Sequence, residues 1–238
     1  MNQQTMIITG ASRGIGKAIA LKLASKNINL VLTARDIHDL EEVAFACRQR
    51  EAEVLIIPGD LADPVIPLKI IEKSRDHFHQ LDVLINNAAV GYPKPFEETS
   101  LEEWNFFMDV NARAPFLLCK HALPYLKKST NPFIINISSV VGHKGYPNQM
   151  AYTASKHALL GLTKVLAREM HDTKIKVHAV CPGGVDTEMV ASTRPDLDPT
   201  NLMKPEEIAG IVEFLLQQKG NAIIDQVNVR RSKSTPFD

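Results

Sequence analysis

The stretch T-G-A-S-R-G-I-G at residues 9–16 decides the fold, because it joins a short apolar run to an amphipathic one. The run before it, residues 6–8, is Met-Ile-Ile, and residues 15–26 after it carry apolar side chains at helical spacing. Glycines between a strand and a helix permit a tight turn and a close approach of the backbone to a ligand. The first turn of such a helix also offers free N–H groups and a positive dipole end. The stretch therefore predicts a strand, a turn and a helix that cradle a phosphate group.

The glycine spacing differs from that of two better-known phosphate-binding loops. Gly10, Gly14 and Gly16 form G-x-x-x-G-x-G, whereas the standard dinucleotide fingerprint is G-x-G-x-x-G. A nucleotide-triphosphatase loop needs a Ser or Thr after Gly-Lys, and Ala18 follows Lys17 here. The turn is therefore expected to hold a pyrophosphate through a variant spacing, without a magnesium-binding hydroxyl.

Short apolar strands and helices alternate from this turn to the end of the chain. The strands are expected at residues 6–8, 28–33, 54–57, 81–85, 133–137, 175–180 and 222–229, and the helices at 15–26, 40–50, 65–78, 101–126, 150–171 and 205–217. Pro115 is expected to kink or split the longest helix, because proline removes a helical hydrogen bond. The alternation predicts the α/β class, as a single doubly wound, Rossmann-type domain over residues 1–238. Its central sheet is expected to be parallel and seven-stranded, with helices on both faces.

Composition excludes several classes of protein. The 27 basic residues balance the 27 acidic residues, so no net charge attracts the chain to nucleic acid or to an anionic membrane. Cys47, Cys119 and Cys181 lie far apart without a C-x-x-C motif, which is typical of reduced thiols in a cytosolic protein. The N-terminus lacks the pattern of a secretory signal, and no apolar run approaches the roughly 18 residues of a membrane span. We therefore expect a cytoplasmic protein, and the spacing of its histidines predicts no metal site.

A second informative stretch, residues 136–156, leaves an apolar strand and closes on a helix. Tyr152 and Lys156 are four residues apart, so they share one helix face. Ser139, at the end of the strand, reaches the same place if the intervening loop folds back. A fixed ammonium lowers the pKa of a nearby phenol, which is otherwise about 10. A hydroxyl, a phenol and a cation around one point suit an oxygen that gains or loses a proton as its carbon gains or loses hydride.

These motifs resemble those of one known family in order and in spacing. They are Thr9-Gly10-x-x-x-Gly14-x-Gly16, Asn86-Asn87-Ala88, Asn111, Ser139, Tyr152-x-x-x-Lys156 and Pro182-Gly183. Spread over most of the chain, they resemble the short-chain dehydrogenase/reductase family, whose compact single-domain branch has a similar length. The family usually has Gly after Asn-Asn-Ala, where this chain has Ala89. The resemblance implies a dehydrogenase/reductase that depends on NAD(P)(H).

By this resemblance, four residues carry the chemistry. Tyr152 would be the general acid in reduction and the general base in oxidation, and Lys156 would lower its pKa and bond the nicotinamide ribose. Ser139 would hold the substrate oxygen, while Ser138 should point the other way. Asn111 would lie at a helix kink and hold a water that links Lys156 to solvent.

The resemblance also implies a set of cofactor-binding residues. Asn87 and Ala88 would lie beside the adenosine ribose, and Leu61 would pack beside the adenine ring. Asp60 either contacts the adenine amino group or is a plain turn residue. The full expected set is Gly10, Ser12, Arg13, Gly14, Ile15, Gly16, Arg35, Asp60, Leu61, Asn87, Ala88, Tyr152, Lys156, Pro182, Gly183, Val185 and Thr187.

The choice of cofactor depends on the end of the second strand. An acid there would bond both ribose hydroxyls and repel a 2′-phosphate, but Ala34 and Arg35 occupy this place. Arg13 in the glycine turn adds a second guanidinium, and two such groups suit a phosphate. We therefore predict NADP(H) in preference to NAD(H). Asp36 is the counter-evidence, since a shift of one residue would bring its carboxylate near the ribose.

The expected function is an NADP(H)-dependent oxidoreductase that interconverts a carbonyl and an alcohol of a small molecule. The alternative is a regulator that binds NADP(H) without turnover. The substrate is either a 3-oxoacyl thioester or a pteridine or small ketone. Residues 183–204 are expected to form a polar substrate loop, and the long helices that begin at residues 101 and 150 are expected to pair subunits in a homodimer or homotetramer.

Overall fold

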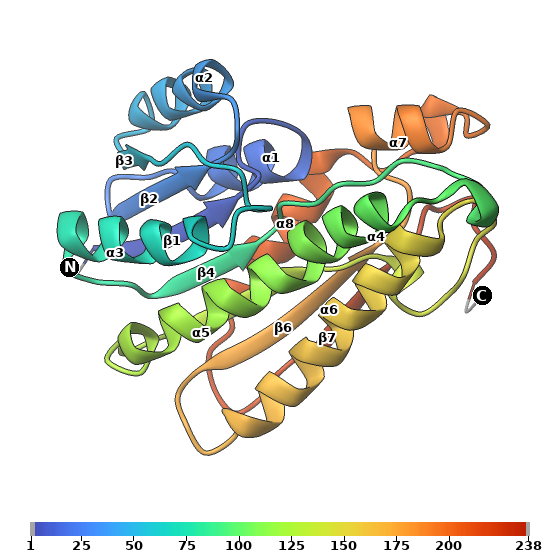
Figure 1. Cartoon of the computed structure of the whole chain (residues 1–238). Helices are drawn as coiled ribbons and strands as arrows, with labels where there is room; N and C mark the ends of the chain where they lie inside the picture. Colours follow the sequence, from blue (N-terminus) through green and yellow to red (C-terminus); the bar gives the residue numbers. More distant parts are fainter. Residues whose placement is uncertain (1–2, 237–238) are drawn as a thin grey trace.

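The computed structural model describes residues 3–236 and has a central sheet with helices packed on both of its faces (Figure 1). The strands are β1 (Gln4–Thr9), β2 (Ile28–Thr33), β3 (Glu53–Ile56), β4 (Val83–Asn86), β5 (Phe133–Ile137), β6 (Lys176–Pro182) and β7 (Gln226–Val229). The α-helices are α1 (Gly14–Leu23), α2 (Ile37–Arg48), α3 (Ile66–Phe78), α4 (Leu101–Met108), α5 (Ala114–Leu126), α6 (Met150–Glu169), α7 (Glu188–Thr193) and α8 (Pro205–Leu216). The predicted class and strand number are confirmed, since the sheet is parallel and has seven strands.

The order of the strands creates a crevice at the centre of the sheet. The order is β3-β2-β1-β4-β5-β6-β7, so the chain winds outward from β1 in one direction, returns beside β1 and winds outward in the other. In register, Ile8 of β1 pairs with Leu32 of β2 on one side and with Ile85 of β4 on the other. Ligands in sheets of this kind bind outside the carboxyl ends of the strands where the winding reverses. That place lies directly beyond Thr9 and Asn86, the last residues of β1 and β4.

Apolar residues occupy both faces of each central strand, and this explains why the strands read as continuous apolar runs. Ile8 faces the core shared with α1, α2 and α8, whereas its neighbour Ile7 faces the core shared with α3 and α5. Both side chains are fully buried. This double burial fixes the register, because a shift by one residue would exchange the two faces.

The long helix expected at residues 101–126 is divided by a π-helical turn, Asp109–Arg113, that separates α4 from α5. Pro115 has no N–H to donate to the carbonyl four residues earlier, and the helix widens before it. The interruption therefore lies just before Pro115, which itself stands in the first turn of α5.

Two other expectations are corrected. The last strand begins at Gln226 rather than at residue 222, after Gly220 with φ +93° and an exposed segment. The expected loop at residues 183–204 contains α7 and a short 3₁₀ turn, Pro199–Asn201. The side chain of Thr187 accepts a hydrogen bond from the N–H of Val190 and so caps α7. The prediction of a loop did not take this cap into account. Within residues 3–236, none of the helices has the length and apolar character that a membrane crossing requires.

Candidate functional site

A cavity of about 1070 Å³ opens above the carboxyl ends of the central strands. Its wall is contributed by the glycine turn, the ends of β2, β3 and β4, the π-turn, α6 and the start of α7. Of the residues expected from the sequence, it is lined by Gly10, Ser12, Arg13, Gly14, Ile15, Arg35, Asp60, Leu61, Asn87, Ala88, Tyr152, Lys156 and Thr187. The cavity therefore brings together residues from widely separated parts of the chain.

The glycine turn is shaped by close contacts with the end of β4. Gly10 has φ +64°, and an ideal Cβ on it would lie 2.8 Å from the Cα of Ala88. The side-chain amide of Asn87 donates to the carbonyls of Thr9 (2.9 Å) and Gly10 (3.2 Å). Gly16 does not line the cavity. It packs against the turn, since an ideal Cβ on it would lie 2.1 Å from the carbonyl oxygen of Gly10. Gly10 thus lets the backbone approach β4, and Gly16 lets α1 pack against the turn.

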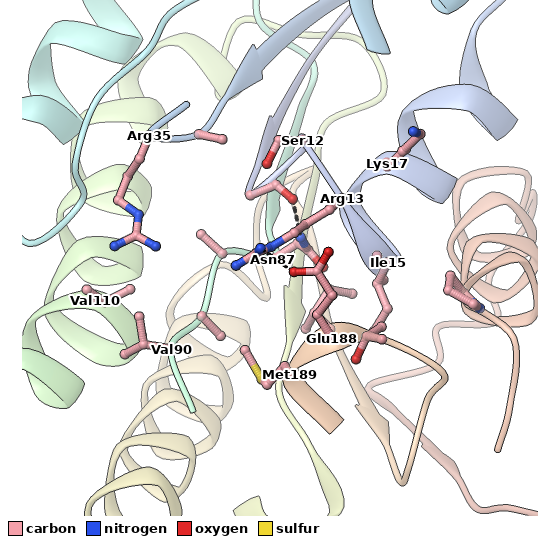
Figure 2. A pocket seen from close by; sticks show the side chains of 18 of the residues that line it. Ser12, Arg13, Ile15, Lys17, Arg35, Asn87, Val90, Val110, Glu188 and Met189 are labelled. Atoms are coloured by element: carbon pink, nitrogen blue, oxygen red, sulfur yellow. Dashed lines mark hydrogen bonds and ion pairs between the residues drawn. The ribbon is translucent and has the colours of Figure 1, made fainter. Parts of the chain in front are cut away.

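The N-terminus of α1 faces the cavity without a side-chain cap. Arg13 occupies the N-cap position, makes no capping hydrogen bond, and is followed by no acidic residue in the first turn. The first N–H groups of a helix lack intrahelical partners and carry the positive end of its dipole. Figure 2 shows Ser12, Arg13 and Ile15 at this point. The arrangement matches the anion-binding helix end that the sequence predicts.

Two guanidinium groups, those of Arg13 and Arg35, line the cavity. Arg13 forms an ion pair with Glu188 of α7, and both side chains remain exposed (Figure 2). Arg35, just after β2, makes no side-chain hydrogen bond or ion pair with any other residue in the described part of the chain. Asp36 also lines the cavity, and its carboxylate caps α2 by accepting from the N–H groups of His38 (2.8 Å) and Asp39 (3.2 Å).

Tyr152 and Lys156 lie on the cavity side of α6, as their spacing predicts. The ammonium nitrogen of Lys156 is 5.8 Å from the centroid of the Tyr152 ring and donates to the carbonyl of Ile137 at 2.9 Å. Ser139 follows β5, and its hydroxyl donates to the carbonyl of Pro182 at 3.3 Å. The Ser139 side chain also forms a hydrogen bond with the phenol of Tyr152. The three groups therefore meet at one end of the cavity, although Ser139 is not part of its wall.

Burial controls the protonation of this group. Burial raises the pKa of Tyr152 to about 12, and the hydrogen bond with Ser139 offsets only part of that rise. Burial also lowers the pKa of Lys156 to about 8, because an ammonium loses its hydration there. Lys156 is not among the causes that shift the pKa of Tyr152, so its expected effect on the phenol stays a prediction. The ammonium bonds a backbone carbonyl instead of the phenol, and desolvation dominates both groups.

Asn111 lies in the π-turn and is fully buried. Its side-chain amide donates to the carbonyl of Val90 and to the hydroxyl of Ser155, each at 2.9 Å, and its oxygen accepts from the N–H of Val90 at 2.8 Å. Asn111 does not line the cavity. Its side chain fastens the segment after β4 to α6, one residue before Lys156.

The segment after β6 is mostly structural. Gly183 donates its N–H to the carbonyl of Val229 at 2.7 Å, and Val185 is buried against Met203. Pro182, Gly183 and Val185 are absent from the wall of the cavity, whereas Thr187 lines it and lies against Gly14. The hydroxyls of Ser138 and Ser139 have different partners, since Ser138 donates to the carbonyl of Lys156 at 3.3 Å, but Ser138 lines the cavity and Ser139 does not, contrary to the expectation that Ser138 points away.

The structure adds residues that the sequence reading missed. Glu188 and Met189 of α7 line the cavity, as do Phe106 and Val110 near the π-turn. An ideal Cβ on Gly91 would lie 3.1 Å from the sulfur of Met189, so α7 touches the segment after β4. No local pattern links these segments, because their contact depends on the packing of the whole domain. Among residues 3–236, no three His, Cys, Asp or Glu side chains are grouped so as to hold a metal ion.

Known proteins with similar sequences and structures identify this arrangement. The sequence model of the short chain dehydrogenase family matches residues 4–198. An uncharacterized oxidoreductase of Thermotoga maritima is 36% identical over 202 residues, which cover 84% of this chain and 80% of that protein. A 3-oxoacyl-(acyl-carrier-protein) reductase of Synechocystis sp. is 33% identical over 230 residues, or 94% and 93% of the two chains.

A solved structure agrees with the sequence relatives. The X-ray structure of an alcohol dehydrogenase from the archaeon Thermococcus sibiricus, complexed with 5-hydroxy-NADP, has a TM-score of 0.90 at 30% identity and covers 99% of both chains. Its likeness extends over the whole sheet and its helices. The chain therefore belongs to the short-chain dehydrogenase/reductase family and is an oxidoreductase.

Proposed function

We propose that the protein interconverts a carbonyl and an alcohol with NADP(H), and that Tyr152 is the general acid and base. One observation carries the proposal. A single cavity joins an uncapped helix N-terminus, suited to phosphate, to the Tyr152–Lys156 pair. A dinucleotide that spans this cavity would bring its reactive ring to the phenol.

The residues present fit a nicotinamide dinucleotide. The cavity of about 1070 Å³ is at the upper end of the range for cofactor sites. Gly10 has no side chain and lines the cavity, so a phosphate could approach its backbone closely. We expect Ser12, Gly14 and Ile15 to hold the pyrophosphate, and Asp60 and Leu61 to hold the adenine. When bound, the nicotinamide supplies or accepts the hydride.

The chain's own residues handle the proton. A pKa of about 12 keeps the Tyr152 phenol protonated at neutral pH, so it can donate to a substrate oxygen during reduction. Ser139 would hold that oxygen in place, and Lys156 would bond the nicotinamide ribose. Asn111 would position α6 and a relay water.

A preference for NADP(H) is supported by the two guanidinium groups. Arg35 has no internal partner in the described residues, whereas Asp36, which lines the same cavity, has one carboxylate oxygen engaged as the cap of α2. The Thermococcus sibiricus relative was solved with 5-hydroxy-NADP. Two guanidinium groups suit a 2′-phosphate.

The wall beside Tyr152 supports an apolar carbonyl substrate. Phe106, Val110 and Met189 line the cavity together with Tyr152, and the ring centroids of Phe107 and Tyr152 are 6.5 Å apart. Both candidate classes keep support, since one relative is a 3-oxoacyl reductase and another an alcohol dehydrogenase. A set of small ketones and 3-oxoacyl thioesters with NADPH absorbance would distinguish them. No oxidation of NADPH with any carbonyl would favour the non-catalytic regulator.

The proposal also covers the cellular location, the oligomeric state and a lid over the substrate. The three cysteines are free and buried, which is typical of a cytoplasmic protein. Phe116 of α5 is 47% exposed and Val165 of α6 is 56% exposed, so these helices carry apolar side chains that a homodimer or homotetramer would cover. The segment at residues 183–204, with α7, would act as a lid on the substrate.

A further inference from the structure

The start of α7 lies across the cavity and touches both of its sides. On the side of the glycine turn, an ideal Cβ on Gly14 would lie 3.1 Å from a methyl of Thr187, and Arg13 forms an ion pair with Glu188. On the opposite side, Met189 lies against the segment after β4. The cap residue Thr187 and the first two residues of α7, Glu188 and Met189, therefore bridge the two walls of the cavity.

The ion pair with Glu188 engages the guanidinium of Arg13, a cation that lines the cavity. Arg13 makes no other side-chain hydrogen bond in the described part of the chain, so Glu188 is its one charged partner there. Both residues line the same cavity, and Figure 2 shows their side chains meeting within it. The carboxylate of Glu188 thus takes a place that another anion could take.

We propose that Glu188 weakens cofactor binding, because its carboxylate competes with a phosphate of the dinucleotide for Arg13. The proposal rests on the proposed function. A guanidinium bonds phosphate and carboxylate through the same paired N–H groups, so the two anions exclude each other at Arg13. Glu188 also repels a phosphate entering the cavity. Binding of the dinucleotide would therefore release the start of α7 from the glycine turn.

The exposure of the pair sets the size of the effect. The Arg13 and Glu188 side chains are 63% and 73% exposed. An exposed pair of this kind is weak, so a cofactor phosphate can displace the carboxylate at a small cost. Removing the charge of Glu188 should tighten cofactor binding about two- to fivefold, which is the range that exposed ion pairs cover.

The experiment measures dissociation constants by the fluorescence of NADPH and of NADH in Glu188→Gln, Arg13→Ala, the double variant and the parent protein. Glu206→Gln serves as the matched control, because Glu206 lines the same cavity but makes no ion pair with Arg13. The expected result is tighter binding in Glu188→Gln, and no such gain when Arg13 is already alanine. The gain should exceed that of Glu206→Gln.

The two cofactors distinguish the possible phosphates. A gain for NADPH alone assigns the competition to the 2′-phosphate, and a gain for both cofactors assigns it to the pyrophosphate. Equal affinities in the parent and Glu188→Gln, or an equal gain in the Arg13→Ala background, would overturn the proposal while leaving the proposed function intact. Failure of the parent and every variant to bind either cofactor would overturn both.

Discussion

The ammonium of Lys156 donates a hydrogen bond to the backbone carbonyl of Ile137, 2.9 Å away, and not to the phenol of Tyr152 one helical turn earlier. The last residue of β5, Ile137, and the face of α6 that carries Tyr152 are thereby joined through one charged side chain. Because this side chain is buried, it holds its proton less tightly than an ordinary lysine. The pKa of Lys156, lowered to about 8, lies close to physiological pH.

This lowered pKa predicts a pH dependence for cofactor capture. As pH rises through about 8, the free protein should lose the Lys156 ammonium, and with it the positive charge near the nicotinamide ribose. We expect kcat/KM for NADPH, which reports the free enzyme, to fall above about pH 8. Lys156→Arg should move that fall to higher pH, because guanidinium keeps its proton. An unchanged pH profile in Lys156→Arg would assign the fall to another group.

Arg35 predicts the preference between the two cofactors. Arg35→Ala should raise the KM for NADPH roughly 10- to 100-fold, as expected for loss of a hydrogen bond to a charged group. The KM for NADH should change little, because NADH has no 2′-phosphate. Arg168→Ala, which removes an exposed guanidinium from α6 away from the cavity wall, is the control. Equal effects of Arg35→Ala on both cofactors would contradict the NADP(H) preference.

Gly10 predicts a conformational requirement at the turn. Gly10→Ala should destabilise the protein by about 1–3 kcal/mol, because alanine is strained at a left-handed backbone angle. The added Cβ would also collide with Ala88, so binding of NADPH should weaken. Gly210→Ala is the matched control, since a Cβ there meets nothing within 4 Å, and it should stabilise α8 by about 0.4–1 kcal/mol. Thermal unfolding and NADPH titration would measure both effects.

His178 predicts how stability changes with pH. The ring is buried in β6, donates to the carbonyl of Ile224 at 2.6 Å, and has no partner for its other nitrogen among residues 3–236. Burial lowers its pKa in the folded protein. The unfolded chain therefore takes up the proton first as pH falls below about 6.5, and stability is lost in that range at up to about 1.4 kcal/mol per pH unit.

His178→Asn should remove this contribution. The variant should be less stable at pH 7.5 but lose about 1 kcal/mol less between pH 7.5 and pH 5.5. The free energy of unfolding in urea at the two pH values gives the comparison. His171→Asn, at an exposed position paired with Asp172, controls for general charge effects. A pH dependence in His178→Asn equal to that of the parent would show that other groups are responsible.

Local signals in the sequence predict most of the fold. β2 and β5 have the bounds expected from their apolar runs, because a strand buried on both faces leaves few alternatives. Gly10 and Gly14 both adopt positive φ angles in the turn expected from residues 9–16. The spacing of Tyr152 and Lys156 predicts their common face, since helix geometry alone determines it.

Features that depend on distant packing could not be predicted. The Arg13–Glu188 pair joins positions 175 residues apart, and the sequence around either position does not indicate that the two are in contact. The upward direction of the Tyr152 pKa depends on burial, which the distance along the sequence between Tyr152 and Lys156 does not reveal. α7 has only six residues, too few to show an apolar period, so its formation depends on the Thr187 cap and on contacts across the cavity.

The proton-transfer role of Tyr152 is tested most directly by Tyr152→Phe, assayed for carbonyl-dependent NADPH oxidation and for NADPH binding in the same preparation. Tyr125→Phe, which removes a phenol hydroxyl remote from the cavity, is the control. We predict a fall in kcat of roughly 10²- to 10⁴-fold in Tyr152→Phe, with the NADPH dissociation constant unchanged within about threefold. A Tyr152→Phe protein that binds NADPH and turns over at the parent rate would contradict the account.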